Sequence, residues 1–270
     1  HLMTTLNTQV RIQNRSGGII STVSLQSFWS SVGPFTTLTG VFDPRVLYDP
    51  YRSRWIHVAC ADPQDTNSAL VVGVSQTNDP TGAWNLFKIR SDAAKLVWAD
   101  YPTVGFNRKW IVVQVNMYPI PSGSLNRSHV YVFDKDSLYA NTSSKHTLLT
   151  LSGEGGTHAP AVTFSSTQDT MFLVKSYQGN QYGFGWLRPY TVTGPVGSEV
   201  LTMGSFISTP NPWDWAGAGS WSDFAPQQGS SNKIMSNDDR MQNVVYRNGY
   251  LWCAHTIFLP AGGSTRSAVQ

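Results

Sequence analysis

The sequence predicts an all-β fold, a β-propeller with five blades favoured, and three observations lead to this class. Short runs rich in Val, Ile, Trp, Tyr and Phe alternate with clusters of Gly, Pro, Asn, Asp and Ser, which is the pattern of strands and turns. A two-strand unit recurs four times along the chain. Helical periodicity is nearly absent. We therefore expect a single domain over residues 1–270, built from similar sheets around a common axis.

The repeated unit starts with a polar residue, passes through Pro or Gln to a Val, and reaches an aromatic residue two positions later. Its four copies are FDPRVLYD, ADYPTVGF, THAPAVTF and DRMQNVVY, and the equivalent valines are Val46, Val104, Val162 and Val244. Each copy is followed by a turn and a second strand pattern, namely RWIHVA, KWIVVQV, TMFLVKS and GYLWCAH. The first two intervals are equal, at 58 residues each, and the third is longer. This spacing fits a four-stranded blade with long loops.

The remaining elements are assigned from their position relative to these units. The first unit also shows two outer strands, ALVVGVS and AWNLFKI, separated by the turn TNDPTG. The N-terminal segments VRIQNRSG and IISTVSLQSFW hold strands with no partner of their own, so we expect them to complete the last blade and remove an open sheet edge. We interpret residues 1–9 as a tag or a disordered segment. Residues 186–236 form either an irregular fifth blade or a long loop on four blades.

Composition limits the classes of partner. Charged residues make up 13% of the chain and aromatic residues 12%, with a net charge of +3. A surface kept soluble by neutral polar groups is typical of exported, glycan-facing proteins, so we expect a secreted or extracytoplasmic monomer whose signal peptide is not present in this chain. No run of Lys or Arg could follow a phosphate backbone, which argues against nucleic acid. No apolar stretch approaches the roughly 18 residues of a membrane span.

The two cysteines, Cys60 and Cys253, are too far apart in sequence for a metal-binding motif, and both lie in apolar strand patterns. Two buried free thiols are the favoured interpretation. The alternative is a disulfide that would tie the first structural unit to the last.

Three segments resemble known proteins. FDPRVLYD, ADYPTVGF and SQTNDPTGAW look like parts of secreted bacterial β-propeller proteins of the sialidase-like and five-bladed glycosidase-like families, and SQTNDPTGAW is similar to the structural Asp-box turn of sialidases. The resemblance implies a carbohydrate-active propeller. Five-bladed glycosidases place a base Asp, a modulating Asp and an acid Glu at the starts of the first three inner strands. The corresponding positions here are Asp43, Asp100 and His158, so the expected Glu is missing, and Glu154 lies four residues before His158.

These positions define the candidate catalytic residues. Because inner strands begin at one mouth of a propeller channel, we expect Asp43, Asp100, Glu154 and His158 to lie near one another. Hydrolysis of a glycosidic bond needs two carboxyl groups, and Asp100 and Glu154 are our first hypothesis for acid and base. The alternative is structural: the aspartates would hydrogen bond to neighbouring strands or line a water-filled channel, and His158 would bridge strands.

Further residues are candidates for substrate binding. Arg45 and Arg240 could neutralise the carboxylate of a uronate. A Gly-rich segment carries three tryptophans that could stack on sugar rings or be buried, namely Trp213, Trp215 and Trp221. Asp238 and Asp239 could offer oxygen ligands to Ca²⁺, but without EF-hand spacing a turn-forming acidic pair is favoured, and we expect no cofactor or metal.

The sequence therefore predicts a carbohydrate-active propeller that binds a glycan or polysaccharide at the mouth of its channel. If it is an enzyme, a glycoside hydrolase is favoured over a polysaccharide lyase. The alternative is a non-catalytic glycan-binding or protein-binding module, which would include the case of one piece of a larger surface protein.

Overall fold

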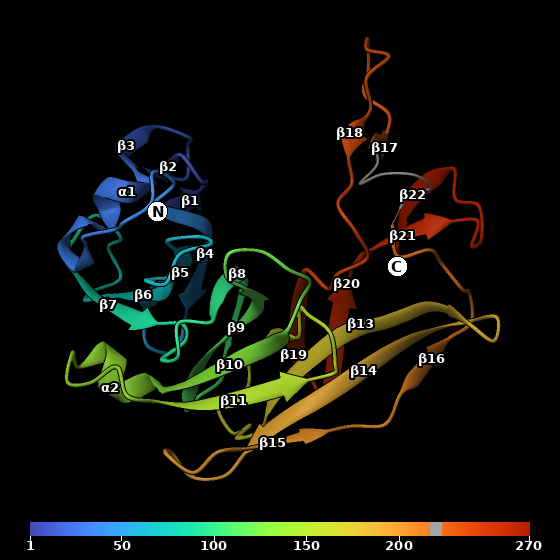
Figure 1. Ribbon diagram of the computed structural model, residues 1–270. Helices are drawn as coiled ribbons and strands as arrows, with labels where there is room; N and C mark the ends of the chain where they lie inside the picture. Colours follow the sequence, from blue (N-terminus) through green and yellow to red (C-terminus); the bar gives the residue numbers. More distant parts are fainter. Residues whose placement is uncertain (217–222) are drawn as a thin grey trace.

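The structure, a computed structural model, describes residues 1–216 and 223–270 of a chain that folds as a β-propeller (Figure 1). Three groups of at least four strands, the first, second and third sheets, each begin with one of the predicted two-strand units, and backbone pairing joins the second and third into one larger sheet of 11 strands. The first contains β4 (Val41–Asp49), β5 (Arg54–Ala61), β6 (Ala69–Ser75) and β7 (Trp84–Arg90). The second contains β8 (Val97–Phe106), β9 (Trp110–Pro119), β10 (Arg127–Asp134) and β11 (His146–Ser152), with helix α2 (Lys135–Tyr139) before β11.

The third sheet contains β12 (Ala159–Thr163), β13 (Met171–Gln181), β14 (Phe184–Thr193), β15 (Val200–Met203) and β16 (Ile207–Thr209). The fourth repeated unit forms only the pair β19 (Asn243–Arg247) and β20 (Tyr250–Ala254). Two hairpins flank it, β17 (Asp223–Ala225) with β18 (Ile234–Met235), and β21 (Thr256–Leu259) with β22 (Arg266–Val269).

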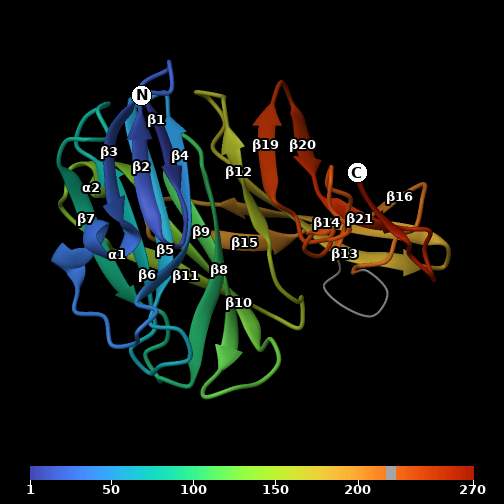
Figure 2. The ribbon, with the colours of Figure 1, turned by 90° about the horizontal axis from the view of Figure 1, so that it is seen from above.

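The N-terminal segment forms a sheet of its own. Its strands are β1 (Leu2–Thr5), β2 (Gln9–Gln13) and β3 (Ile19–Ser24), followed by α1 (Leu25–Phe28) and the single 3₁₀ turn η1 (Ser30–Val32). This differs from the expectation that these strands complete the last blade: no strand pairing in the described part of the chain joins them to β19–β22. Instead, Met3 packs with Trp29 and Val41 against the first sheet (Figure 2).

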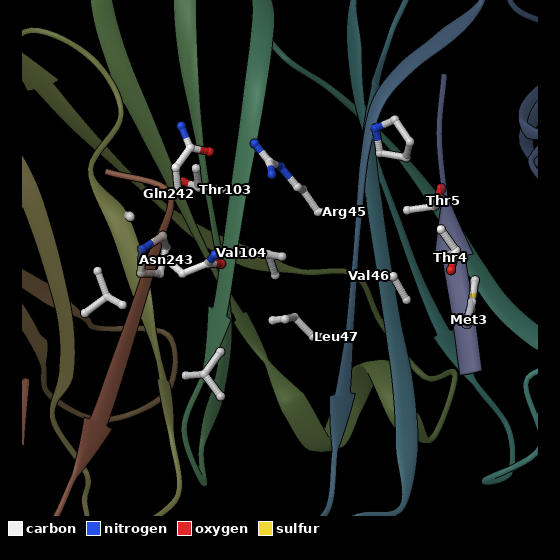
Figure 3. A pocket seen from close by; sticks show the side chains of 15 residues that line it. Met3, Thr4, Thr5, Arg45, Val46, Leu47, Thr103, Val104, Gln242 and Asn243 are labelled. Carbon is white, nitrogen blue, oxygen red and sulfur yellow. The ribbon is translucent and has the colours of Figure 1, made fainter. Parts of the chain in front are cut away.

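The sheets surround an axial cavity of about 310 Å³ (Figure 3). Its lining comes from β1 of the N-terminal sheet, from β4 of the first sheet, and from β8, β12 and the start of β19, which belong to one 11-stranded sheet. Apolar clusters fill the spaces between successive sheets, from the N-terminal sheet round to the β19–β20 pair. The inner strands also pair directly, because β12 runs parallel to both β8 and β19. Gly105 permits this approach, since a Cβ atom there would lie 2.5 Å from the carbonyl oxygen of Ala161.

Two segments are more regular than the sequence indicated. Residues 2–5 form the ordered strand β1 and not a disordered segment, because Met3 contributes an apolar side chain to the core. The interval 186–236 was expected to be a loop or an atypical blade, yet as far as Thr209 it supplies the outer strands of the third sheet. Two short strands pair with the same edge of β14: β16 with residues 185–187 and β15 with residues 190–193. Pro189 lies between these two pairings, so β14 tolerates a residue that has no backbone N–H to donate.

Both cysteines are free. Cys60 is buried between the first two sheets, whereas Cys253 packs between the third sheet and β19–β20. The interpretation as free thiols is confirmed. No helix in residues 1–216 or 223–270 is long and apolar enough to cross a membrane.

Candidate functional site

Two equivalent irregularities interrupt the inner strands β4 and β8. The strand register slips between Phe42 and Arg45 in β4 and between Asp100 and Thr103 in β8. Each slip contains a residue with φ of 49° followed by proline, Asp43 in β4 and Tyr101 in β8. A positive φ at a residue other than glycine costs about 1–3 kcal/mol and is concentrated at functional sites. Asp43 in β4 and Tyr101 in β8 therefore occupy equivalent positions in their strands, as do Phe42 and Asp100.

Although they occupy different register positions, the side chains of Asp43 and Asp100 meet. The two carboxyl groups lie close enough for an interaction between the side chains to contribute to the pKa of Asp100. Burial, followed by the negative charge of Asp43, raises the pKa of Asp100 from 3.8 to about 6. Asn7 holds Asp43 from the other side, because its Oδ1 accepts the backbone N–H of Asp43 at 2.7 Å and its Nδ2 donates to Oδ1 of Asp43 at 3.5 Å.

Two arginines, Arg240 and Arg45, lie over the Tyr101 ring and form the cationic side of the site. The Arg240 guanidinium lies 4.1 Å from the centroid of the Tyr101 ring, and Arg45 lies 5.0 Å from the same centroid. Arg240 also donates two hydrogen bonds of 2.6 Å to the carboxylate of Asp238. Its positive charge acts on Asp100 and opposes the rise in the pKa of that carboxyl group. Arg240 therefore forms an ion pair with Asp238 and acts electrostatically on Asp100.

Arg45 belongs to the axial cavity. Its Nε donates to the carbonyl oxygen of Pro102 at 3.3 Å, and its guanidinium reaches from β4 across the cavity towards Thr103 and Gln242 (Figure 3). The Tyr101 hydroxyl donates to Oε1 of Gln242 at 3.0 Å. Arg45 and Arg240 thus contact the same tyrosine but line different cavities.

A second cavity, of about 380 Å³, lies beside the aspartate pair between the second and third sheets and the segment that leads to β19. Tyr118 connects this cavity with the aspartate pair. It lines the cavity, and burial together with the negative charge of Asp100 raises the pKa of its hydroxyl. The cavity is lined by aromatic and polar side chains, chiefly Asn116, Tyr118, Thr157, Lys175, Ser176, Tyr177, Gln178, Trp215, Asp238, Asp239 and Arg240. Polar groups around exposed aromatic rings are the surface that a sugar requires.

The three predicted tryptophans differ in their accessibility. Trp215 is 62% exposed and lines the cavity of about 380 Å³. Trp213 is completely buried and its Nε1 donates to Asp239 at 2.9 Å, so its ring is not free to stack on a ligand. Trp221 lies outside the described residues. Burial also raises the pKa of Asp239, whose Oδ2 accepts a hydrogen bond of 2.6 Å from Ser176.

Glu154 is held in a separate polar cluster. Its two carboxylate oxygens accept hydrogen bonds of 2.8 and 2.7 Å from Arg188, and the Tyr190 hydroxyl donates a third at 2.7 Å. No hydrogen bond or ion pair within the described chain joins Glu154 to Asp43 or Asp100. The structure therefore brings the two predicted aspartates together and leaves Glu154 with other partners.

His158 is a buried aromatic neighbour of this cluster. Its ring packs edge-on against Tyr190 with the centroids 4.8 Å apart. Burial, reinforced by the charges of Lys175 and Arg188, lowers the pKa of His158 to about 3, so the imidazole is neutral at physiological pH. Neither ring nitrogen has a hydrogen-bond partner within the described residues.

The residues that sequence reasoning missed are Tyr118 and Lys175. Lys175 stands in the apolar strand pattern TMFLVKS, and a lysine inside a buried strand was an available signal. For metals, residues 1–216 and 223–270 contain no group of three or more His, Cys, Asp or Glu side chains that could hold an ion. Asp238, considered for Ca²⁺, is bound by Arg240 instead.

Comparisons with known proteins give distant structural likenesses. No protein-family model and no curated protein matches the sequence. Among solved structures, the chain is similar to a subtype N11 neuraminidase-like protein of A/flat-faced bat/Peru/033/2010 (H18N11), at 9% identity and a TM-score of 0.47, covering 97% of this chain and 65% of that one. It is also similar to a hypothetical selenium-binding protein of Sulfolobus tokodaii, at 14% identity and a TM-score of 0.41, covering 74% and 46%. An exo-1,5-alpha-L-arabinanase from a bovine ruminal metagenomic library matches at 9% identity and a TM-score of 0.41, covering 99% and 86%. The chain thus spans about two thirds and about half of the lengths of the first two proteins.

Proposed function

We propose that this propeller binds a glycan in the cavity of about 380 Å³ beside Asp43 and Asp100. The observation that carries the proposal is the lining of this cavity, where Tyr118, Tyr177 and the exposed Trp215 stand among amide, hydroxyl and charged groups. Aromatic faces stack on the apolar side of a sugar ring, while polar groups hydrogen bond to its hydroxyls. A cavity of this size suits a small number of sugar residues.

A binding panel tests this proposal. Isothermal titration of the purified chain against neutral and acidic oligosaccharides should detect saturable binding, and Trp215→Ala should weaken it roughly fivefold through the loss of one stacking contact. Trp252→Ala is the matched control, because Trp252 is similarly exposed (64%) on β20 and does not line the cavity. Equal losses in both variants, or no binding by the parent chain, would contradict the proposal.

A second candidate function, glycoside hydrolysis, is favoured by the pKa of Asp100. A carboxyl group with a pKa of about 6 is protonated in part of the molecules near neutral pH and can donate a proton to a leaving oxygen. Known glycosidases hold two carboxyl groups roughly 5–10 Å apart, and Asp43, whose negative charge acts on Asp100, is the second carboxyl group of this candidate function.

A hydrolysis screen decides between binding alone and catalysis. Aryl glycosides and plant, algal and microbial polysaccharides are incubated with the parent chain and with Asp100→Asn. If Asp100 is the proton donor, the variant loses roughly 10²-fold to 10⁴-fold in rate while its affinity for the same substrate changes little. Asp136→Asn, an exposed acid on α2, is the control. Glycan binding without any turnover would leave the binding function and remove the catalytic one.

A further inference from the structure

Lys175 is a buried cation at the wall of the cavity of about 380 Å³. It lies on β13, is only 9% exposed, and contributes to the cavity lining. Its Nζ donates one hydrogen bond of 3.1 Å, to the carbonyl oxygen of Ser176, and lies 5.1 Å from the centroid of the Tyr177 ring. An ammonium group has three N–H donors, so the contacts within the described chain leave two of them unused.

The carboxylates near Lys175 have other partners. No Asp or Glu oxygen of the described residues lies within 4.0 Å of its Nζ, the distance that defines the ion pairs of this protein. Asp239 accepts from Ser176 and Trp213, and Glu154 accepts from Arg188 and Tyr190. Both acids still attract the lysine from a distance, yet burial is the larger effect and lowers the pKa of Lys175.

A buried ammonium without a counter-ion is unfavourable, because desolvation is not offset by a close negative charge. An anionic group placed in the cavity would provide that charge. Gly155 allows the ammonium group to lie against the backbone, because an added Cβ atom at that glycine would come within 3.1 Å of Nζ. The other cation in this lining, Arg240, already donates twice to Asp238.

The neutral groups around Lys175 fit the remainder of a sugar. Asn116 and Thr157, which hydrogen bond to each other at 3.2 Å, line the same cavity, as do the phenol of Tyr118 and the exposed ring of Trp215. We infer that the ligand is an acidic sugar whose carboxylate binds the Lys175 ammonium, while its hydroxyls and ring contact these neutral side chains. This inference rests on the proposed glycan-binding function and specifies the substrate class.

The test compares acidic sugars with their neutral counterparts on the full chain. Titrations use a hexuronate oligosaccharide and its methyl ester, and in a parallel arm sialyllactose and lactose. In the arm whose acidic sugar the chain recognises, the parent chain should bind the acid roughly tenfold to a hundredfold more tightly than the neutral sugar. This is the expected effect of a hydrogen bond between charged groups. Lys175→Met should abolish this preference and retain the affinity for the neutral sugar. Lys145→Met, at an exposed lysine, should change neither.

The outcomes separate the two proposals. Equal affinities of the parent chain for acid and neutral sugar in both arms overturn the inference and leave glycan binding standing. An acid preference that survives in Lys175→Met also overturns it. Absence of binding to every sugar removes the proposed function itself. A thermal unfolding curve accompanies each variant, and Lys175→Met is expected to be at least as stable as the parent because a methionine fills similar space without a buried charge. If that variant does not fold, equal affinities of the parent chain for acid and neutral sugar still overturn the inference.

Discussion

Two carboxylate clusters lie on different sheets and are built in opposite ways. Asp100 faces another acid, Asp43, and burial together with that negative charge raises the pKa of Asp100. Glu154 faces a guanidinium and a phenol, and its oxygens are fully engaged by Arg188 and Tyr190. An acid beside an acid has a proton available near neutral pH, whereas an acid beside an arginine contributes to stability as an ion pair. The difference shows that a sequence position near a channel mouth does not by itself define a carboxylate as catalytic.

The largest effect is expected from breaking the Glu154 cluster. Arg188→Met should lower the free energy of unfolding by about 3 kcal/mol, because it leaves a carboxylate whose side chain is only 15% exposed without its cation. Urea unfolding followed by tryptophan fluorescence measures this loss. Adding Glu154→Gln to the same chain should recover part of it, and failure to do so would show that Arg188 acts through its packing on Phe206 instead.

Neutralising Asp100 should have the opposite sign. Because its pKa is raised from 3.8 to about 6, the protonated form is favoured by folding; that contribution is complete below about pH 4 and is lost as pH rises through about 6. The full shift corresponds to about 3 kcal/mol, which partial solvent access reduces to about 2 kcal/mol. Asp100→Asn should therefore be more stable than the parent by about 2 kcal/mol at pH 8 and equal to it at pH 4. A stability difference that does not change with pH would contradict the raised pKa.

Asp43→Asn isolates the interaction between the two acids. It removes the negative neighbour and leaves the burial of Asp100, so the pKa of Asp100 should fall by about one unit and remain above 3.8. Carboxyl ¹³C chemical shifts recorded against pH provide the measurement. A return to 3.8 would mean that Asp43, and not burial, is the dominant cause.

The smallest effect is expected from Asn7, which holds Asp43 from the N-terminal sheet. Asn7→Ala removes the acceptor of the Asp43 backbone N–H and should cost about 1 kcal/mol in the free energy of unfolding. Carboxyl ¹³C chemical shifts recorded against pH would show whether the pKa of Asp100 stays raised without this support. Asn14→Ala, at an exposed turn of the same sheet, serves as the comparison for general effects on that sheet.

The sequence was sufficient for the repeated framework and insufficient for the details of the site. Val46, Val104, Val162 and Val244 do mark the inner region of four successive sheets, because strand periodicity and turn residues are local signals. The meeting of Asp43 with Asp100 depends on two register slips, which alternate patterns of apolar residues do not encode. The burial of Trp213 and the isolation of Glu154 depend on which sheets become neighbours, a long-range property.

The way the sheets are joined has a dynamic consequence. β8, β12 and β19 are linked by parallel backbone pairing into one 11-stranded sheet. Among the described strands, β1–β3 pairs only within itself and meets the first sheet through side chains, Thr5 with His57 of β5 and Asn7 with Asp43 of β4. Amide protons of β1–β3 should therefore exchange with solvent through a local opening of lower free energy than the unfolding of the whole domain. Each such opening would also break the hydrogen bonds between Asn7 and Asp43. The amide exchange rates of β1–β3 would therefore measure how often Asp43 loses its contact with Asn7.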